Sequence, residues 1–494
     1  MNDAPVMSVA RLVSGIEGVR IVGSSERGVA ALVHDSRAVR PGSAYVALPG
    51  TRVDGHEFVA QALAAGASTI VVDAAHAALV ERAGEAYTGI VVPETGLALS
   101  RLAATFYANP SATLDVVGVT GTNGKTTTVA LIAAILDGSG IAAGRIGTLG
   151  AEFGGDERPL ANTTPLALEL QALLADMRGR GARVVAMEVS SHALALGRVA
   201  DVRFACAVLT NVTRDHLDFH GSFEAYAAAK RRLFDTAQYA VVNRDDPAGA
   251  VWGRALPAER CTTYGLDTAA DVRAERLAST PGGSTFFVDG QRFVIRLPGR
   301  FNVANALAAI AVARRFGVED RESARVLAAF ERVPGRMEHF ADGGLDVIVD
   351  YAHTPDALAN VLHAAREASR GRVVVVFGCG GDRDRGKRPE MGRIANELAD
   401  RAIVTSDNPR GEEPGAIIDE ILAGFVPDER TAVEPDRRLA IRLAISEARP
   451  GDVVVVAGKG HETYQIVGGE RRHFDDREEA AAALRARARA EELA

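Results

Sequence analysis

Short apolar runs that end in polar or glycine-rich segments recur along this chain. The run at 114–117 leads into a glycine-rich turn, and an apolar-periodic stretch at 129–136 follows that turn. Strands that are apolar throughout are typical of parallel sheets covered by helices on both faces. Similar runs lie further along the chain, at 183–189, 206–211, 347–350, 373–377, 402–405 and 453–457. The pattern predicts an α/β protein.

Turn residues divide these runs into three groups. Asn109-Pro110-Ser111 and Val333-Pro334-Gly335 are strong turn sequences, and the chain is too long for one hydrophobic core. We therefore predict a small N-terminal α/β domain at 1–111, a central phosphate-loop domain with a parallel sheet at 112–335, and a Rossmann-like α/β domain at 336–494. The tail from 477 is expected to be a helix with a solvated charged face.

Composition narrows the class of protein. Hydrophobic residues make up 47% and charged residues 24% of the chain, as in ordinary globular proteins, so disorder is not indicated. A formal net charge of −8 argues against nucleic acid as a partner. The three cysteines have no CxxC spacing, and the chain shows neither a signal pattern nor an apolar run long enough for a membrane span. We expect a cytoplasmic protein that does not contact membranes, and we expect a monomer.

The glycine-rich turn carries the most specific chemistry. A turn between strand and helix that ends in Gly124-Lys125-Thr126 places backbone N–H groups, a lysine and a hydroxyl around a polyphosphate and its metal. Val119 stands where a strict Walker pattern has glycine, which points to one branch of the phosphate-loop enzymes. The predicted ATP-binding residues of this turn are Gly118, Thr120, Gly121, Thr122, Asn123, Gly124, Lys125, Thr126 and Thr127.

Polar residues follow the next two apolar runs. Glu188 and Ser190 end one of them, and Thr210 and Asn211 end the other. Carboxyl ends of parallel strands meet at one edge of a sheet, so we expect these residues beside the phosphate loop. Glu188 is then a candidate Mg²⁺ ligand together with Thr126, and His216 is a candidate for a metal or phosphate contact.

Six segments together resemble the Mur ligases, the ATP-dependent amino-acid-adding enzymes of peptidoglycan synthesis. The order and spacing of the segments match over nearly the whole chain. They are GTNGKTTT at 121–128, EVSSH at 188–192, TNVTRDHLD at 210–218, FNVANA at 301–306, PGRME at 334–338 and DYAHTP at 350–355. Within the family, HDSR at 34–37, NTTP at 162–165 and SDNPR at 406–410 resemble the members that add diaminopimelate.

The resemblance implies a ligation in two steps. The D-glutamate carboxylate of UDP-N-acetylmuramoyl-L-Ala-D-Glu takes the γ-phosphoryl group of ATP, and the amine of meso-diaminopimelate then displaces phosphate. It implies ATP and Mg²⁺ at two metal sites, with Lys125, Lys230 and His216 as catalytic residues. Lys230 corresponds to a lysine that is carbamylated in the family and would bind metal with Thr126, Glu188 and His216; from the residues alone it would be an exposed helical lysine.

The resemblance also assigns the ligand-binding residues. Leu196 stands where related enzymes can have glutamine, and Thr51-Arg52-Val53 corresponds to a further contact loop. The nucleotide would also contact Asn302, Asn305, Arg336 and Asp350. The UDP-sugar dipeptide would contact Ser36, Asn162, Thr163, Thr164, Ser190 and Arg198. Diaminopimelate would contact Arg383, Asp407, Asn408, Pro409, Arg410, Gly458 and Glu462.

Rival interpretations remain open at this point. A lysine-adding member or a folylpolyglutamate synthetase would share the phosphate loop, but the Asp407-Asn408-Pro409-Arg410 turn and the segment at 35–37 argue against both. A phosphate-loop switch protein would hydrolyse its nucleotide without needing an amino acid. The segment around Cys379 lacks the spacing of a dinucleotide-binding loop, and a small buried cysteine is the simpler interpretation.

Overall fold

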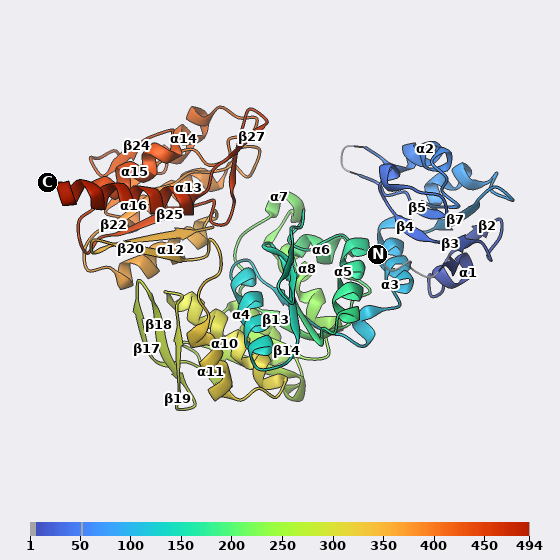
Figure 1. Cartoon of the computed structure of the whole chain (residues 1–494), viewed down its shortest axis with the longest axis horizontal. Helices are drawn as coiled ribbons and strands as arrows, with labels where there is room; N and C mark the ends of the chain where they lie inside the picture. Colours follow the sequence, from blue (N-terminus) through green and yellow to red (C-terminus); the bar gives the residue numbers. More distant parts are fainter. Residues whose placement is uncertain (1–5, 51–52, 494) are drawn as a thin grey trace. The chain divides into compact units, whose positions relative to one another are not determined.

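The computed structural model describes residues 6–50 and 53–493. Backbone contacts divide the chain into two compact units, and each is described by itself below (Figure 1). Unit 1 comprises Met1–Thr120, Ile141–Ala207 and Ala228–Tyr239, and unit 2 comprises Gly121–Gly140, Val208–Ala227 and Ala240–Ala494.

Unit 1 begins with a small mixed sheet. Its strands lie in the order β2 (Arg20–Val22), β7 (Thr88–Val92), β6 (Thr69–Asp73), β5 (Ser43–Val46) and β4 (Ala31–Val33). Only the β2–β7 pair of this sheet is antiparallel. Alternate residues of β5 and β6 enter two different hydrophobic clusters, because successive side chains of a strand point to opposite faces. The helices of this segment are α1 (Val9–Leu12), α2 (Val59–Ala64) and α3 (Thr95–Phe106), and β1 (Met7–Ser8) pairs with β3 (Gly28–Val29).

The rest of unit 1 carries the strand that leads into the phosphate loop. Its strands lie in the order β11 (Asp156–Arg158), β10 (Gly150–Phe153), β9 (Ala143–Gly147), β12 (Val184–Glu188), β8 (Asp115–Thr120) and β13 (Phe204–Leu209). β12 runs parallel to both of its neighbours, as the apolar runs predict. The antiparallel β10 and β11 at the edge are not predicted by those runs. The helices are α5 (Ala167–Gly179), α6 (Ser191–Ala195) and most of α8 (Phe223–Thr236).

Unit 2 contains the loop itself and the helix that follows it. The last residues of β13 belong to this unit, and β14 (Ala240–Asn243), β15 (Cys261–Gly265) and β16 (Val272–Arg273) continue in that order. α4 (Lys125–Gly138) packs against α10 (Arg300–Arg315). Most residues of both helices are buried, which agrees with the apolar stretches 129–136 of α4 and 306–313 of α10. The other helices of this part are α7 (Leu217–His220), α9 (Pro247–Ala255) and α11 (Asp320–Ala329), and β17 (Glu275–Thr280), β18 (Gly283–Val288) and β19 (Gln291–Ile295) form a separate antiparallel sheet.

The C-terminal part of unit 2 is a sheet with helices on both faces (Figure 1). The strand order is β20 (Glu338–Asp342), β21 (Leu345–Asp350), β25 (Val453–Ala457), β22 (Val373–Phe377), β23 (Arg401–Val404) and β24 (Thr431–Val433), with only β20 antiparallel. Val453 and Val455 pack on one face of the sheet, and Val454 and Val456 pack on the other. One face is covered by α12 (Pro355–Ala368), α13 (Lys387–Leu398) and α14 (Pro414–Leu422), and the other by α15 (Arg437–Glu447) and α16 (Asp476–Leu493).

These sheets confirm the predicted α/β architecture, whereas the boundaries at 111 and 335 stay predictions. The prediction for the tail also holds in part, since α16 forms and buries Ala480 and Leu484 against α15. Cys379 is buried as predicted, with its thiol 3.6 Å from the Met391 sulfur, and burial raises its pKa to about 12.

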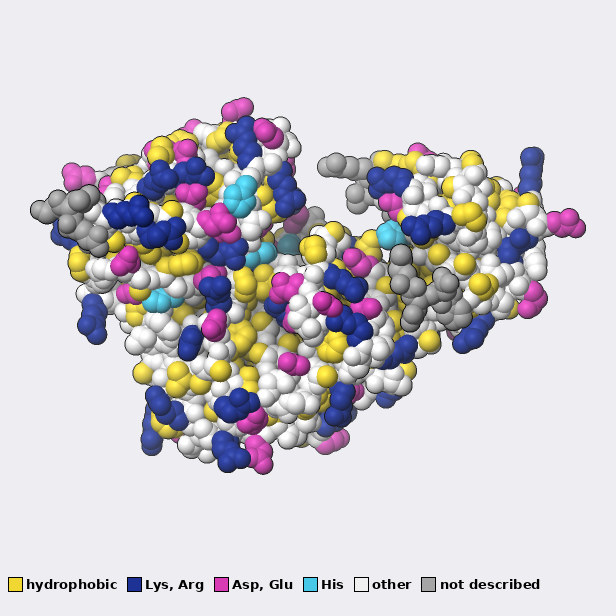
Figure 2. Space-filling model, in the orientation of Figure 1, with side chains coloured by type: hydrophobic (Ala, Val, Ile, Leu, Met, Phe, Trp, Pro, Cys, Tyr) yellow, Lys and Arg dark blue, Asp and Glu magenta, His cyan; other side chains and the backbone are white. Residues whose placement is uncertain are grey.

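The surface carries both signs of charge. On the face in view in Figure 2, Lys and Arg side chains are interspersed with Asp and Glu, and many of the exposed arginines have a nearby carboxylate, as in the Arg393–Glu397 pair. Among the described residues, we find no helix with the length and apolar character that a membrane span requires.

Candidate active site

The phosphate loop, residues 121–124, joins β8 to α4 and depends on two glycines. Gly124 directly precedes the helix with φ of 83°, and a Cβ there would lie 2.4 Å from the Asn305 side-chain oxygen. A Cβ on Gly121 would lie 1.8 Å from the Thr210 hydroxyl. Both positions therefore require glycine. Val119, where a Walker loop has glycine, is a fully buried strand residue whose carbonyl accepts from the Val189 N–H, so no glycine is needed there.

The segment after β13 holds the loop in place. The Asn211 side chain accepts from the Asn123 N–H at 2.9 Å and donates to the Asn123 carbonyl at 3.1 Å, and the Thr210 hydroxyl donates to the same carbonyl at 2.6 Å. The Thr122 hydroxyl lies 3.0 Å from both the Thr213 carbonyl and the Tyr226 hydroxyl. The prediction that Thr210 and Asn211 lie beside the loop is confirmed.

Positive side chains gather at the start of α4. Lys125 Nζ donates to the Gly121 and Thr122 carbonyls at 2.9 and 2.8 Å, so the lysine lies across the loop that is predicted to hold phosphate. Arg336 Nη2 donates to the Thr126 hydroxyl at 3.1 Å, and its guanidinium lies 4.6 Å from the Tyr351 ring centroid. A cation, a hydroxyl and backbone N–H groups thus converge at one helix N-terminus, as anion binding requires.

Asp350 ends β21 beside this arginine. Its carboxylate accepts from the Met337 N–H at 2.7 Å. Burial raises the pKa of Asp350, and the positive charge of Arg336 opposes that rise. The arginine is therefore near enough to favour the charged form of the Asp350 carboxyl.

Asn302 and Asn305 lie behind the loop. The Asn305 oxygen accepts from the Thr128 hydroxyl at 3.2 Å, and its amide donates to Asn302, which in turn donates to the Pro298 carbonyl. Both side chains are buried. In this structure they support the loop, and their contact with a nucleotide stays a prediction.

Asp356 is a neighbour of the loop that the sequence analysis missed. Its Oδ2 accepts from the Asn123 amide at 2.7 Å and from the Thr213 hydroxyl at 3.3 Å. Burial raises its pKa, and these two hydrogen bonds oppose the rise. The only signal in the sequence is its position directly after the segment at 350–355.

In unit 1, Glu188 and Thr164 form the centre of a polar network. Glu188 is buried, and its carboxylate accepts from the Thr148 N–H at 2.7 Å. The Thr164 hydroxyl donates to the Glu188 carbonyl at 2.9 Å and contacts the Ser190 hydroxyl at 3.3 Å. Arg198 donates to the Thr164 carbonyl at 3.2 Å, and burial lowers the pKa of its guanidinium.

The structure thus brings Thr164, Ser190 and Arg198 together. The Thr163 hydroxyl lies 3.0 Å from the Thr148 hydroxyl, which connects it to the same network. Asn162, which directly precedes Thr163, is exposed. The Ser36 hydroxyl, in another part of unit 1, donates to the Gln61 side-chain oxygen at 3.4 Å. Thr51 and Arg52 lie outside the described residues.

Lys230 corrects one interpretation made from the residues alone. It is 1% exposed, so the expectation of an exposed helical lysine is wrong. Its place in α8 is the reason, because Tyr226, Ala229, Leu233 and Phe234 of the same helix are also buried. His216, in contrast, is half exposed with φ of 52° and lies 3.4 Å from the Asp215 carboxylate.

A second polar cluster lies at the carboxyl ends of β23 and β25. The Asn408 amide donates to Glu462 at 2.8 Å, and its oxygen accepts from Lys459 at 3.2 Å. Lys459 Nζ also lies 3.4 Å from Glu462 and 3.5 Å from Asp407. Burial raises the pKa of Glu462, against the opposing charge of Lys459. Lys459 was missed, although its sequence between Gly458 and Gly460 could have singled it out.

Arg410 lies beside this cluster in a left-handed backbone conformation. Its guanidinium donates to the Gly381 carbonyl at 2.7 Å, and its N–H donates to the Ile466 carbonyl at 3.0 Å. The exposed Arg383 donates to the Asp382 carbonyl at 3.0 Å. Both arginines are therefore attached to successive carbonyls of one loop. Pro409 is buried against that loop, and the N–H of Gly458 donates to the Asp350 carbonyl.

Three family models match the chain along its length. The model of the Mur ligase family catalytic domain matches 29–107, the Mur ligase middle domain matches 119–313, and the Mur ligase glutamate ligase domain matches 335–460.

Curated proteins and solved structures agree with these models. The UDP-N-acetylmuramoyl-L-alanyl-D-glutamate--2,6-diaminopimelate ligase of Thermosynechococcus vestitus is 47% identical over 99% of this chain and 98% of its own length. The protein of the same name from Gloeobacter violaceus is 49% identical over 92% of this chain and 94% of its own. A solved structure with that name is 34% identical, covers 98% of this chain and 99% of the other, and has a TM-score of 0.68. The chain belongs to the Mur ligase family.

Proposed function

We propose that this protein is the ATP-dependent ligase that joins meso-diaminopimelate to the D-glutamate γ-carboxylate of UDP-N-acetylmuramoyl-L-Ala-D-Glu in the cytoplasm. The observation that carries the proposal is the 47–49% identity to curated relatives of that name over at least 92% of the chain. The monomeric state, the boundaries of the domains and the individual site residues belong to the proposal.

The reaction begins at the phosphate loop. Attack of the γ-carboxylate on the γ-phosphorus of ATP breaks the bond to the bridging oxygen and gives an acyl phosphate and ADP. Lys125, the N–H groups of 121–127 and Arg336 neutralise the charge on the transferring phosphoryl group. Lys125 now donates to two loop carbonyls, so its Nζ would exchange these bonds for phosphate oxygens.

The second step forms the amide. The amine of diaminopimelate attacks the acyl carbon, phosphate leaves with the electron pair, and the amine loses a proton. The cluster of Asn408, Lys459 and Glu462 supplies a buried carboxylate whose charged form is penalised by burial. A substrate ammonium near Glu462 would stabilise that charged form, while Arg410 would form a bidentate pair with a substrate carboxylate.

The residues also fit Mg²⁺. The buried Glu188 carboxylate and the Thr126 hydroxyl are hard oxygen donors of the kind that Mg²⁺ prefers. Carbamylation of Lys230 would convert a buried cation into another oxygen donor, and His216 would complete the second site. Bound Mg²⁺ would supply charge neutralisation at the phosphates.

ADP release tests the function directly. The purified chain is given ATP, Mg²⁺ and UDP-N-acetylmuramoyl-L-Ala-D-Glu, with meso-diaminopimelate, L-lysine or no amino acid. We expect rapid ADP release with meso-diaminopimelate alone, and none from Lys125→Ala. Equal release without an amino acid would favour a nucleotide switch, and faster release with lysine would identify a lysine-adding ligase.

Arg410→Ala tests the specificity. The control is Arg472→Ala on the hairpin of β26 (Tyr464–Val467) and β27 (Glu470–His473), whose residue Val467 forms a bridge with Arg410. Arg410→Ala should raise KM for diaminopimelate by at least about tenfold and leave KM for ATP nearly unchanged, because a charge-assisted pair with the substrate carboxylate is lost. Equal changes in both KM values would contradict the assignment.

Lys230→Ala, with the exposed Arg232→Ala of the same helix as control, tests the modified lysine. We expect an inactive variant that short carboxylates partly rescue. An unmodified Lys230 ε-amine in a well-resolved crystal structure of the active enzyme would contradict the carbamate.

A further inference from the structure

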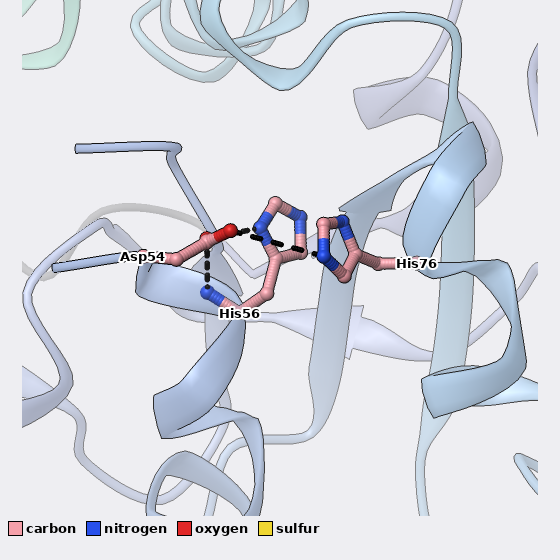
Figure 3. A group of neighbouring side chains, drawn as sticks. All are labelled: Asp54, His56 and His76. Atoms are coloured by element: carbon pink, nitrogen blue, oxygen red, sulfur yellow. Dashed lines mark hydrogen bonds and ion pairs between the residues drawn. The ribbon is translucent and has the colours of Figure 1, made fainter. Parts of the chain in front are cut away.

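A cluster of metal-ligating side chains lies in the N-terminal sheet segment of unit 1, directly after the predicted contact loop at 51–53. Asp54, His56 and His76 each offer one ligand atom, and these atoms all lie within 4.8 Å of one another (Figure 3). Asp54 caps the short helix Gly55–Phe58 that carries His56, and His76 lies in the helix Ala74–Val80 after β6. Two separate turns of one sheet thus present the cluster.

The two imidazole rings and one carboxylate lie side by side, and the nitrogen atoms of both rings are near the carboxylate. The rings are stacked, with centroids 3.9 Å apart and an interplanar angle of 14°. Asp54 Oδ1 lies 2.6 Å from His56 Nδ1, and Asp54 Oδ2 lies 3.8 Å from His76 Nε2. Figure 3 shows this carboxylate directed at the nitrogen-bearing edges of both rings.

A second carboxylate, Asp73, faces the other nitrogen of each ring. Asp73 Oδ1 lies 2.8 Å from His76 Nδ1, and Asp73 Oδ2 lies 3.6 Å from His56 Nε2. A histidine that binds a metal through one nitrogen almost always donates its other N–H to a carboxylate, a carbonyl or water, which fixes the tautomer and raises ligand basicity. Here Asp73 Oδ1 is within hydrogen-bond distance of His76 Nδ1, and Asp73 Oδ2 is near enough to His56 Nε2 to accept from it after a small shift.

We infer that Asp54, His56 and His76 bind a divalent transition metal of the Zn²⁺ class, oriented by Asp73. Two imidazoles and a carboxylate are the ligands that borderline ions such as Zn²⁺ and Co²⁺ prefer over Mg²⁺. His56 is buried, whereas the Asp54 and His76 side chains are 35% and 37% exposed. The fourth coordination position therefore opens to solvent, where water or a small anion completes the shell.

Binding requires the half-exposed His76 ring to turn out of the stack, because a metal ion lies in the plane of each imidazole that binds it. Tetrahedral Zn²⁺ with bonds of about 2.0–2.1 Å separates its ligand atoms by about 3.3 Å, so the 2.6 Å contact opens and the 3.8 Å contact closes as the exposed Asp54 side chain turns. In the metal-free cluster the Asp73 N–H donates to His56 Nε2 at 3.3 Å, which places the proton of His56 on Nδ1. The metal takes the place of that proton at Nδ1, the imidazole carries its proton on Nε2 instead, and Nε2–H then donates to Asp73 Oδ2 in place of the bond from the Asp73 N–H.

Titration with Co²⁺ tests the site in the full-length chain. Millimolar Mg²⁺ is kept present so that oxygen-donor sites are filled, and the visible spectrum of Co²⁺ reports a four-coordinate site with nitrogen ligands. Zn²⁺ should displace the Co²⁺ signal. X-ray absorption of the Zn²⁺ form should show two imidazoles.

Variants separate a metal site from a hydrogen-bonded cluster. His76→Ala and Asp54→Asn should each weaken binding by at least about 100-fold. Asp73→Asn, which keeps a helix-capping side chain, should weaken it by roughly 10–100-fold. The exposed His473→Ala is the control and should bind as the unaltered chain does. Melting curves in a chelator check that the variants fold.

The inference is overturned if the unaltered chain shows no four-coordinate Co²⁺ spectrum in Mg²⁺, or if His76→Ala binds equally well. An absorption spectrum without imidazole scattering overturns it even where a variant fails to fold. The result does not depend on the ligase activity, so failure of one proposal leaves the other standing.

Discussion

Lys459→Met should destabilise the C-terminal sheet, because it removes a fully buried cation. Nζ of Lys459 lies within 3.2–3.5 Å of Asn408, Glu462 and Asp407. Removing one partner of a buried ion pair costs about 3–5 kcal/mol. Burial already raises the pKa of Glu462, so this carboxyl can take up a proton once the cation is gone, and we expect the lower end, about 3 kcal/mol.

The chain has several sheets, so one global unfolding transition would not isolate this effect. Hydrogen exchange of the β25 amides measures the local opening free energy instead. A loss of about 3 kcal/mol corresponds to roughly 150-fold faster exchange in β25. The loss of opening free energy in Lys459→Met should shrink as pH falls, because a protonated Glu462 carries no charge that needs a neighbouring cation. Adding Glu462→Gln to Lys459→Met should recover part of the lost free energy for the same reason.

Arg442→Met, an exposed substitution in α15, is the matched control and should leave exchange in β25 unchanged. Exchange that rises less than about threefold in Lys459→Met, or equally in Arg442→Met, would refute the reasoning. The buried ammonium would then contribute no more than a surface charge.

Two further predictions concern the loop and acid stability. Gly124→Ala should weaken ATP binding, measured by calorimetry, by at least about tenfold, since a left-handed alanine costs about 1 kcal/mol and its Cβ would lie 2.4 Å from the Asn305 oxygen. The control is Gly140→Ala, where φ is 82° and no atom lies within 4 Å of the added Cβ, and its affinity for ATP should be near normal. Similar losses of affinity in both variants would contradict the steric account. Hydrogen bonds from the buried Arg388 of α13 lower the pKa of Glu412 to about 2. The charged Glu412 therefore stabilises the fold at any pH above the ordinary carboxyl pKa, and this stabilisation is lost as the pH falls toward 2. The opening free energy of the α13 amides, measured by hydrogen exchange, should therefore fall less between pH 4.5 and 2 in Glu412→Gln than in the unaltered chain, whereas the exposed Glu413→Gln should behave as the unaltered chain does.

The apolar runs predicted the central strands because a strand that is buried on both faces is apolar throughout and does not alternate with polar residues. β12, β21, β22 and β25 are examples. The antiparallel β17, β18 and β19 were missed, since their half-exposed residues form a weak pattern and their pairing depends on turns.

Site residues could be predicted where a short sequence pattern places them, and they could not be predicted where contacts between distant segments place them. The phosphate loop and the neighbouring Thr210 and Asn211 followed from strand ends and glycine spacing. Asp356 reaches the loop from α12, and Lys459 is buried by segments distant in sequence. The burial of Lys230 depends on how α8 packs, which helical periodicity alone does not give.

The hydrogen bond from Gly458 N–H to the Asp350 carbonyl has a consequence for inhibitor design. β21 and β25 are adjacent, and this bond joins a residue proposed to contact the nucleotide with one proposed to contact the incoming amino acid. A compound carrying mimics of both ligands on a short linker would bind its second group at an effective concentration in the millimolar range. Such a bivalent molecule should gain avidity without any new protein contact.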